Sequence, residues 1–141
     1  MRAIIVGGGI GGIACALALK QKGIDYKILE RSKKFSAVGA GIQLSPNATR
    51  ILYWLGVAET LEKKAVEPIE HRFLDWCTGD TILRTPLGSK AREFFGWPYW
   101  HVNRADLLES LSHGLKTSDI QFCSEIISID QNDTSAWVTN E

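Results

Sequence analysis

The chain has 141 residues, enough for one domain with a buried core, and 45% of them are hydrophobic. Sixteen basic residues balance sixteen acidic ones, and no stretch combines Lys and Arg with aromatic residues, so we expect no nucleic-acid partner. Cys15, Cys77 and Cys123 are an odd number without C-x-x-C spacing, which indicates buried, reduced thiols and no metal set. Because no secretory signal is expected, we expect a cytoplasmic location.

The first thirty residues predict a strand, a glycine-rich turn, a helix and a second strand. An apolar run at 2–6 leads into the turn Gly7-Gly8-Gly9-Ile10-Gly11-Gly12. Good helix formers follow at 13–20, and 25–30 is typical of a strand that ends in Glu30. This order is that of a nucleotide-binding βαβ unit.

The spacing Gly7-x-Gly9-x-x-Gly12 gives each glycine a physical task. Gly7 makes the tight turn, Gly9 lets the backbone approach a pyrophosphate, and Gly12 lets helix and strand pack closely. Free N–H groups and the positive end of the helix dipole then face the phosphates. Glu30, 18 residues after Gly12, stands where such units hydrogen-bond the adenosine ribose, and a solvated strand end is the alternative.

The uncharged stretch at 3–19 also has to be tested as a signal peptide or membrane span. Five of the six residues at 7–12 are glycine, and each glycine destabilises a helix by roughly 1 kcal/mol relative to alanine. Seventeen residues are also at the short limit for crossing a bilayer. We therefore expect a soluble protein without a membrane segment.

The middle of the chain predicts a loop at 31–36 and an extended segment with several glycines at 38–44. Two helices are predicted to follow, at 47–55 and 57–65. Ser45 is a good N-cap and Pro46 suits the first helical position, while Gly56 ends the first of these helices.

From residue 66 onward the pattern becomes that of β-structure. We expect a hairpin of 69–77 with 81–85, followed by an irregular segment at 87–97. A strand at 99–103 and a helix at 105–115 come next, and three further strands follow at 120–122, 125–130 and 136–139. The predicted organisation is a βαβ unit with following helices at 1–66, a hairpin excursion at 67–98, and a return to the first domain at 99–141.

Three separated segments carry a family resemblance. They are the glycine fingerprint with Glu30-Arg31, the stretch Gly39-Ala40-Gly41-Ile42-Gln43-Leu44-Ser45-Pro46-Asn47-Ala48, and Asn103-Arg104-Ala105-Asp106-Leu107-Leu108. In these segments the chain resembles the N-terminal part of the FAD-dependent aromatic hydroxylases, flavoprotein monooxygenases of the salicylate and p-hydroxybenzoate hydroxylase type. The resemblance implies an α/β fold with a Rossmann-like FAD-binding parallel sheet and a β-hairpin directed toward a substrate-binding sheet.

The resemblance also implies a cofactor site. Its residues are Gly7, Gly9, Ile10, Gly11, Gly12, Glu30, Arg31, Gly41, Ile42, Gln43 and Arg104. The glycine turn would lie under the FAD pyrophosphate, with Arg31 beside the adenine end, and 39–43 would pass near the flavin. Arg104 would reach the phosphates or the ribitol, and its alternative is a helix-start residue paired with Asp106.

The family reaction uses NAD(P)H to reduce FAD and oxygen to hydroxylate an aromatic small molecule. No catalytic acid or base stands out, because His71, His101 and His113 have no evident partner. The aromatic residues at 94–100 either line a substrate pocket or pack in a core.

Family members are more than twice as long as this chain, so the resemblance implies an incomplete N-terminal portion that is inactive alone. Its exposed apolar surface would be covered by the missing C-terminal half or by self-association. Two alternatives stay open at this point: an NAD(P)-dependent oxidoreductase domain, and a non-catalytic, truncated nucleotide-binding module.

Overall fold

The structure, a computed structural model, describes residues 2–35 and 39–140. Their contacts form two compact units: unit 1 comprises Met1–Val38 and Leu107–Glu141, and unit 2 comprises Gly39–Asp106. The domain boundaries predicted from the sequence, between residues 66 and 67 and between residues 98 and 99, are not tested by this grouping and stay a prediction.

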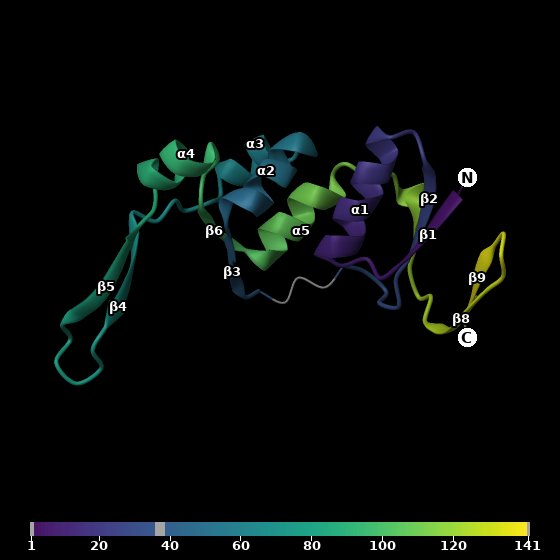
Figure 1. The fold of residues 1–141 in the computed structure, drawn as a ribbon. Coiled ribbons are helices and arrows are strands. Elements are labelled where there is room, and N and C mark those ends of the chain that lie inside the picture. Colours follow the sequence, from purple (N-terminus) through teal and green to yellow (C-terminus); the bar gives the residue numbers. More distant parts are fainter. Residues whose placement is uncertain (1, 36–38, 141) are drawn as a thin grey trace. The chain divides into compact units, whose positions relative to one another are not determined.

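Unit 1 is built on a three-stranded parallel sheet in the order β1-β2-β7, with α1 as the crossover between β1 and β2 (Figure 1). The bounds are β1 Arg2–Val6, α1 Ile10–Gln21, β2 Asp25–Leu29 and β7 Ile120–Gln121. α1 buries Ile13, Ala16 and Leu17, while β2 buries Ile28. The predicted βαβ unit is thus confirmed, and within the described residues neither α1 nor another helix is long and apolar enough to cross a membrane.

The remainder of unit 1 follows α5 (Arg104–Ser112), which begins at the end of unit 2. A short 3-10 helix, η1 (Thr117–Asp119), leads into β7, and β8 (Ile126–Gln131) pairs with β9 (Ala136–Asn140) as a separate antiparallel hairpin. The Tyr26 hydroxyl donates to Asp119 Oδ2 at 3.0 Å, which ties β2 to η1.

Unit 2 is organised around the antiparallel pair β3 (Gly41–Leu44) and β6 (Trp100–Asn103). The helices of this unit are α2 (Pro46–Trp54), α3 (Ala58–Glu62) and α4 (Ser89–Phe95). Alternating residues of the two strands are buried, with Leu44 opposite Trp100 on the covered face. Thr49 on α2 is fully buried, and its hydroxyl donates to the Pro98 carbonyl at 2.7 Å.

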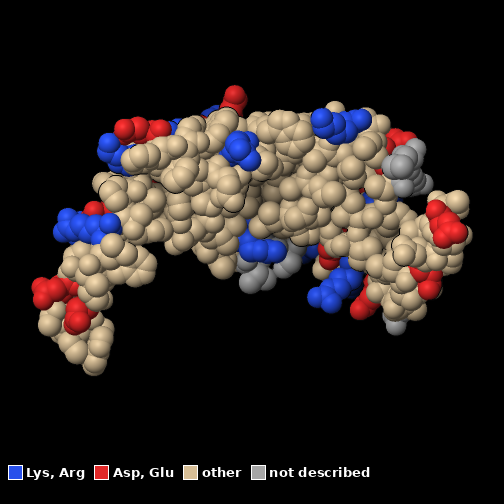
Figure 2. Space-filling model, in the orientation of Figure 1, with Lys and Arg blue, Asp and Glu red and all other residues tan. Residues whose placement is uncertain are grey.

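The hairpin of unit 2 consists of β4 (Glu70–Leu74) and β5 (Thr81–Pro86). Its turn uses Gly79 at φ +75, and the Asp75 carboxylate accepts the backbone N–H groups of Cys77 and Thr78. Every residue of β5 is exposed, and Trp76 near the tip is 92% exposed. Figure 2 shows a mostly uncharged surface along this hairpin, with acidic side chains toward its tip. Both strands expose large apolar side chains, namely Phe73, Leu74, Ile82 and Leu83.

Three local expectations were wrong, and the expectation of Ser45 as an N-cap was confirmed in position only. The segment 87–97, expected to be irregular, contains α4, which Gly88 at φ +53 and Gly96 at φ +75 bracket. The helix expected at 57–65 is confined to α3. Ser45 is the N-cap of α2, yet its hydroxyl bonds the Asn47 side chain instead of the helix backbone. The three cysteines are exposed rather than buried, because Cys15 lies on the outer side of α1 and the other two lie in turns.

Candidate nucleotide-binding site

The glycine turn between β1 and α1 has the geometry that its spacing predicts. Gly7 adopts φ +101, and its N–H donates to the Leu29 carbonyl at 2.8 Å. A Cβ added to Gly12 would overlap the Gly7 carbonyl oxygen and lie 3.3 Å from Ile5 Cγ2. Only a residue without a side chain therefore lets the first turn of α1 lie this close to β1.

The N-terminus of α1 is open to an anion. Gly9 is the N-cap in an extended conformation, and among the described residues no side chain accepts the first N–H groups of the helix. The first turn contains no acidic residue, and a Cβ on Gly9 or Gly11 would meet no atom of another described part of the chain within 4 Å. The unpaired helix donors and the positive end of the dipole therefore remain for a ligand such as a diphosphate.

Glu30 lies beside this turn, at the end of β2. Its Oε2 accepts the Gly8 N–H at 2.6 Å, and its Oε1 accepts the Ser32 N–H at 2.9 Å. Burial acts to raise the pKa of the Glu30 carboxyl, but the bonds from Ser32 and Gly8 and the charge of Arg31 together hold that pKa below its usual value. The carboxylate is therefore ionised and fixed in orientation at neutral pH.

Gly8 and Ser32 are site residues that the sequence reasoning missed. Gly8 is buried, and a Cβ there would lie 3.1 Å from both Glu30 Oε2 and Phe35 Cε1. A side chain at this position would push the carboxylate away from its two donors. The sequence did contain a signal for Gly8. The fingerprint requires glycine at positions 7 and 9 but not between them, and yet position 8 is also glycine.

The other predicted cofactor residues gather in unit 2. Gly41 and Gln43 lie on the exposed face of β3, whereas Ile42 shares the covered face with Leu44. Arg104 directly follows β6, and its backbone N–H donates to the Ala40 carbonyl at 2.9 Å. The predicted set thus falls into one group on unit 1 and one group on unit 2.

The alternative for Arg104, an ion pair with Asp106, is not what the structure contains. Asp106 Oδ1 lies 2.8 Å from Lys64 Nζ instead. The start of α5 is held by Asn103, whose Oδ1 accepts the Ala105 N–H at 2.9 Å. The guanidinium of Arg104 therefore has no part in fixing the helix start through Asp106.

Gln43 is hydrogen-bonded to a cluster of three rings, Tyr99, His71 and His101. The Tyr99 hydroxyl donates to Gln43 Oε1 at 2.8 Å, and the Tyr99 ring lies edge-on to His71 and His101, at centroid distances of 5.3 and 5.8 Å. The two imidazoles stack at 5.9 Å, and their Nε2 atoms are buried without a hydrogen-bond partner among the described residues. Two of the three histidines, unassigned from the sequence, thus pack together at the root of the hairpin.

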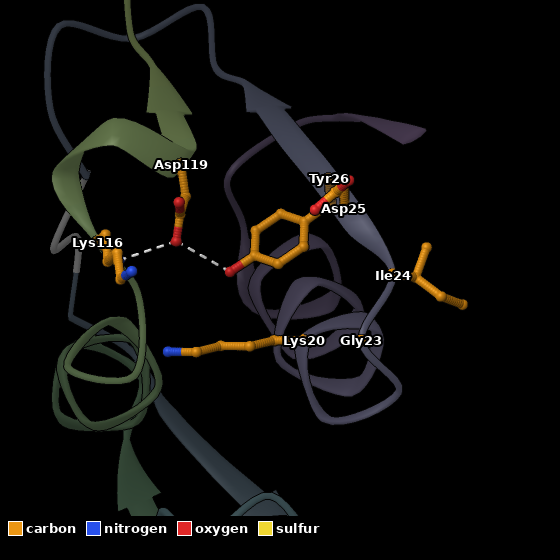
Figure 3. A pocket seen from close by; sticks show the side chains of 7 residues that line it. All are labelled: Lys20, Gly23, Ile24, Asp25, Tyr26, Lys116 and Asp119. Carbon is orange, nitrogen blue, oxygen red and sulfur yellow. Dashed lines mark hydrogen bonds between the residues drawn. The ribbon is translucent and has the colours of Figure 1, made fainter. Parts of the chain in front are cut away.

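A hollow of about 250 Å³ also lies beside α1, but it is at the wrong end for a dinucleotide (Figure 3). It is lined by Lys20 at the end of α1 and by Tyr26 at the start of β2, one helix length from the glycine turn. Asp119 accepts the Tyr26 hydroxyl and the Lys116 N–H there (Figure 3). Burial, together with the bond and charge of Asp119, raises the pKa of Tyr26 to about 12.

Comparison with known proteins gives matches over nearly the whole chain. A family model described as an FAD binding domain matches residues 1–139. The 3-amino-4-hydroxybenzoate 2-monooxygenase of Streptomyces cremeus is 39% identical over 121 residues, which are 86% of this chain and 31% of that protein. The 3-hydroxybenzoate 6-hydroxylase of Polaromonas naphthalenivorans is 36% identical over 141 residues, covering 98% of this chain and 35% of that protein.

The fold has equally clear counterparts among solved structures. Klebsiella pneumoniae HpxO, in complex with FAD and uric acid, superposes with a TM-score of 0.84 at 27% identity, covering 98% of this chain and 34% of that one. This chain therefore spans about a third of the length of the proteins that it matches.

Proposed function

Because this chain belongs to the FAD-binding-domain family, we propose that it is the FAD-binding part of a flavin-dependent monooxygenase that hydroxylates an aromatic small molecule with NAD(P)H and oxygen. When bound, FAD supplies the redox and oxygen chemistry, and the protein supplies binding, orientation and exclusion of water. The related hydroxylases act on hydroxybenzoates, which supports a ring that carries hydroxyl and carboxyl groups as the substrate class.

One observation carries the proposal: an uncapped helix N-terminus and an oriented carboxylate lie together at the end of a parallel βαβ unit. The donors of α1 would hold the pyrophosphate, and Glu30 would hold the ribose through the lone pairs that Gly8 and Ser32 leave free. Both groups are in place before a ligand binds, which lowers the cost of ordering the site.

The remaining contacts belong to the same proposal. Arg31, exposed beside Glu30, would lie at the adenine end, and Arg104 would reach the phosphates or ribitol. Gly41 would face the flavin with its backbone and Gln43 with side chain and backbone. Ile42 would do so with its backbone alone, because its side chain lies on the covered face of β3.

We propose two further features of the whole protein, a cytoplasmic location and an occupant for the apolar hairpin. The exposed side chains of β4 and β5 support a covering partner, either a further segment of a longer chain or a second copy. Light scattering on the isolated chain tests the second copy: we expect concentration-dependent association that Ile82→Lys weakens. Fractionation of cells that express the protein tests the location.

The experiment that tests FAD binding is a titration of the purified chain with FAD, followed by flavin fluorescence. We expect saturable but weak binding, loss of flavin during gel filtration and no hydroxylation by the isolated chain. Gly9→Ala is the sharpest variant, because its methyl group would meet no atom of the described residues within 4 Å beyond its chain neighbours, and glycine at this position of the fingerprint lets a pyrophosphate approach the backbone. It should cost about 0.5–1 kcal/mol of stability as an N-cap change, and lower FAD affinity at least tenfold.

The control is Glu125→Gln, which removes an exposed carboxylate from the same unit and should leave FAD affinity unchanged. A parallel titration with NAD separates the dehydrogenase alternative, for which NAD would bind as tightly as FAD and respond equally to Gly9→Ala. Absence of saturable FAD binding at millimolar concentrations, in a chain that shows native circular dichroism, would leave the proposal without support.

A further inference from the structure

Unit 2 contains a hollow whose lining residues include none of the residues that we assign to FAD binding. Its volume is about 430 Å³, and it is lined by Arg50, Ile51, Tyr53, Trp54 and Trp97. Four of these residues lie on α2, and Trp97 comes from the segment that follows α4. The volume lies within the range of small-molecule sites, and three of the five side chains are aromatic.

Two of the aromatic residues that line the hollow pack against each other, and one of them also packs against the buried Trp100. The Tyr53 ring lies 5.2 Å from Trp97 and 5.8 Å from Trp100, and Trp100 is only 1% exposed. Burial, together with the nearby carboxylate of Glu62, raises the pKa of Tyr53, and Glu62 itself lies 3.4 Å from the Arg92 guanidinium. The Tyr53 ring is therefore packed against two indoles, one of which is buried.

A buried hydrogen bond joins the two sides of the hollow. Thr49 Oγ1 on α2 donates to the carbonyl of Pro98, next to Trp97, and Thr49 is completely buried. Gly96, in a left-handed conformation at φ +75, ends α4 and starts the segment that carries Trp97. The hollow is thus a feature of the packed unit, and a ligand would find it already formed.

The mouth of the hollow combines apolar surface with one cation. Ile51 is 42% exposed and Trp54 is 48% exposed, although the opposite face of α2 is buried. Arg50 is the one charged side chain among the lining residues, and it forms no ion pair with another residue in the described ranges. A guanidinium binds carboxylates in a bidentate manner, and indole faces stack on planar rings.

We propose that this hollow binds a planar aromatic anion. The ring would lie against Trp54 and Trp97, and its carboxylate or sulfonate group would pair with Arg50. This site is separate in its residues from the FAD site, so it does not depend on the proposed function.

The test is a titration of the isotope-labelled chain with 1-naphthoate, followed by the indole N–H resonances. We expect saturable shifts of the Trp54 and Trp97 resonances, while those of Trp76 and Trp137 stay in place. Arg50→Gln should weaken the binding about tenfold, because a hydrogen-bonded charge pair is lost. The uncharged analogue 1-naphthalenemethanol should bind the native chain and the Arg50→Gln variant equally.

Arg84→Gln is the matched control, since it removes an exposed arginine from the hairpin of the same unit. Equal loss of naphthoate affinity in both variants would overturn the proposal, as would shifts of similar size at Trp76. Shifts of Trp54 that depend on protein concentration without ligand would instead show that a second copy covers the hollow. Because Arg50 is exposed, unchanged far-ultraviolet circular dichroism of Arg50→Gln establishes that the comparison is between folded chains.

Discussion

The closeness of α1 to β1 predicts opposite effects of the same substitution at two neighbouring glycines. In Gly12→Ala the new methyl overlaps the Gly7 carbonyl oxygen and lies 3.2 Å from the Gly7 carbonyl carbon, so backbone must move. Overpacking of this kind costs about 1–3 kcal/mol, with the upper part of that range appropriate for a backbone neighbour. The higher helix propensity of alanine offsets about 1 kcal/mol of this cost, so the free energy of unfolding should fall by about 2 kcal/mol in total.

Gly11→Ala is the matched control, because in the part of the chain that the structure describes its methyl would meet no atom outside its own helix within 4 Å. Without an overlap only the helical preference remains, so we expect a gain of about 0.5–1 kcal/mol. Thermal unfolding followed by circular dichroism measures both: roughly 3 °C per kcal/mol gives a midpoint about 6 °C lower for Gly12→Ala and up to about 3 °C higher for Gly11→Ala. Equal midpoints for the two variants would refute the close-packing argument for Gly12.

Two other predictions concern polar groups outside the nucleotide site. Thr49→Val keeps the shape of the side chain but leaves the buried Pro98 carbonyl without its donor, so it should destabilise the chain by about 1–3 kcal/mol, whereas Thr49→Ser should retain most of the stability in the same urea titration. The Tyr26 pKa of about 12 lies above its ordinary value of 10.0, so the stability linked to Tyr26 is present below pH 10 and is lost as the pH rises toward 12. Thermal midpoints across that alkaline range should fall more steeply for the native chain than for Tyr26→Phe, and Asp119→Asn should lower the pH at which Tyr26 ionises, as read from phenolate absorbance. Parallel alkaline profiles for the native chain and Tyr26→Phe would contradict this assignment.

The elements that sequence reasoning located are those specified by neighbouring residues. The turn after β1 needs glycine at φ +101, and the hairpin turn needs Gly79 at φ +75, so both leave a local signature. The expectation of irregular structure at 87–97 was wrong, because Gly88 and Gly96 flank a helix, α4, there. Glycine marks where the chain changes direction, and the residues between two glycines decide what lies there.

The candidate site was predictable in its residue types but not in its connections. The bond between Gly8 and Glu30 spans 22 positions, and the bond between Tyr99 and Gln43 spans 56. Pairings over such separations depend on how the strands align, which the sequence pattern does not encode. The exposure of Cys15 has a similar origin, because one small residue on a helix gives little indication of which side faces the sheet.

The position of Glu30 decides how variants of this site should be interpreted. Its two oxygens already accept backbone N–H groups, so Glu30→Gln places an amide N–H₂ against one donor and disturbs the turn even without a nucleotide. A loss of FAD affinity in that variant would therefore combine a missing ribose contact with a displaced Gly8. Gly9→Ala avoids this ambiguity, because the added methyl would meet no atom of the described residues within 4 Å beyond its chain neighbours and so leaves the bonds of Glu30 in place. Agreement between the two variants would locate the nucleotide at the turn, whereas an effect of Glu30→Gln alone would assign Glu30 to the structure of the turn and not to the ligand.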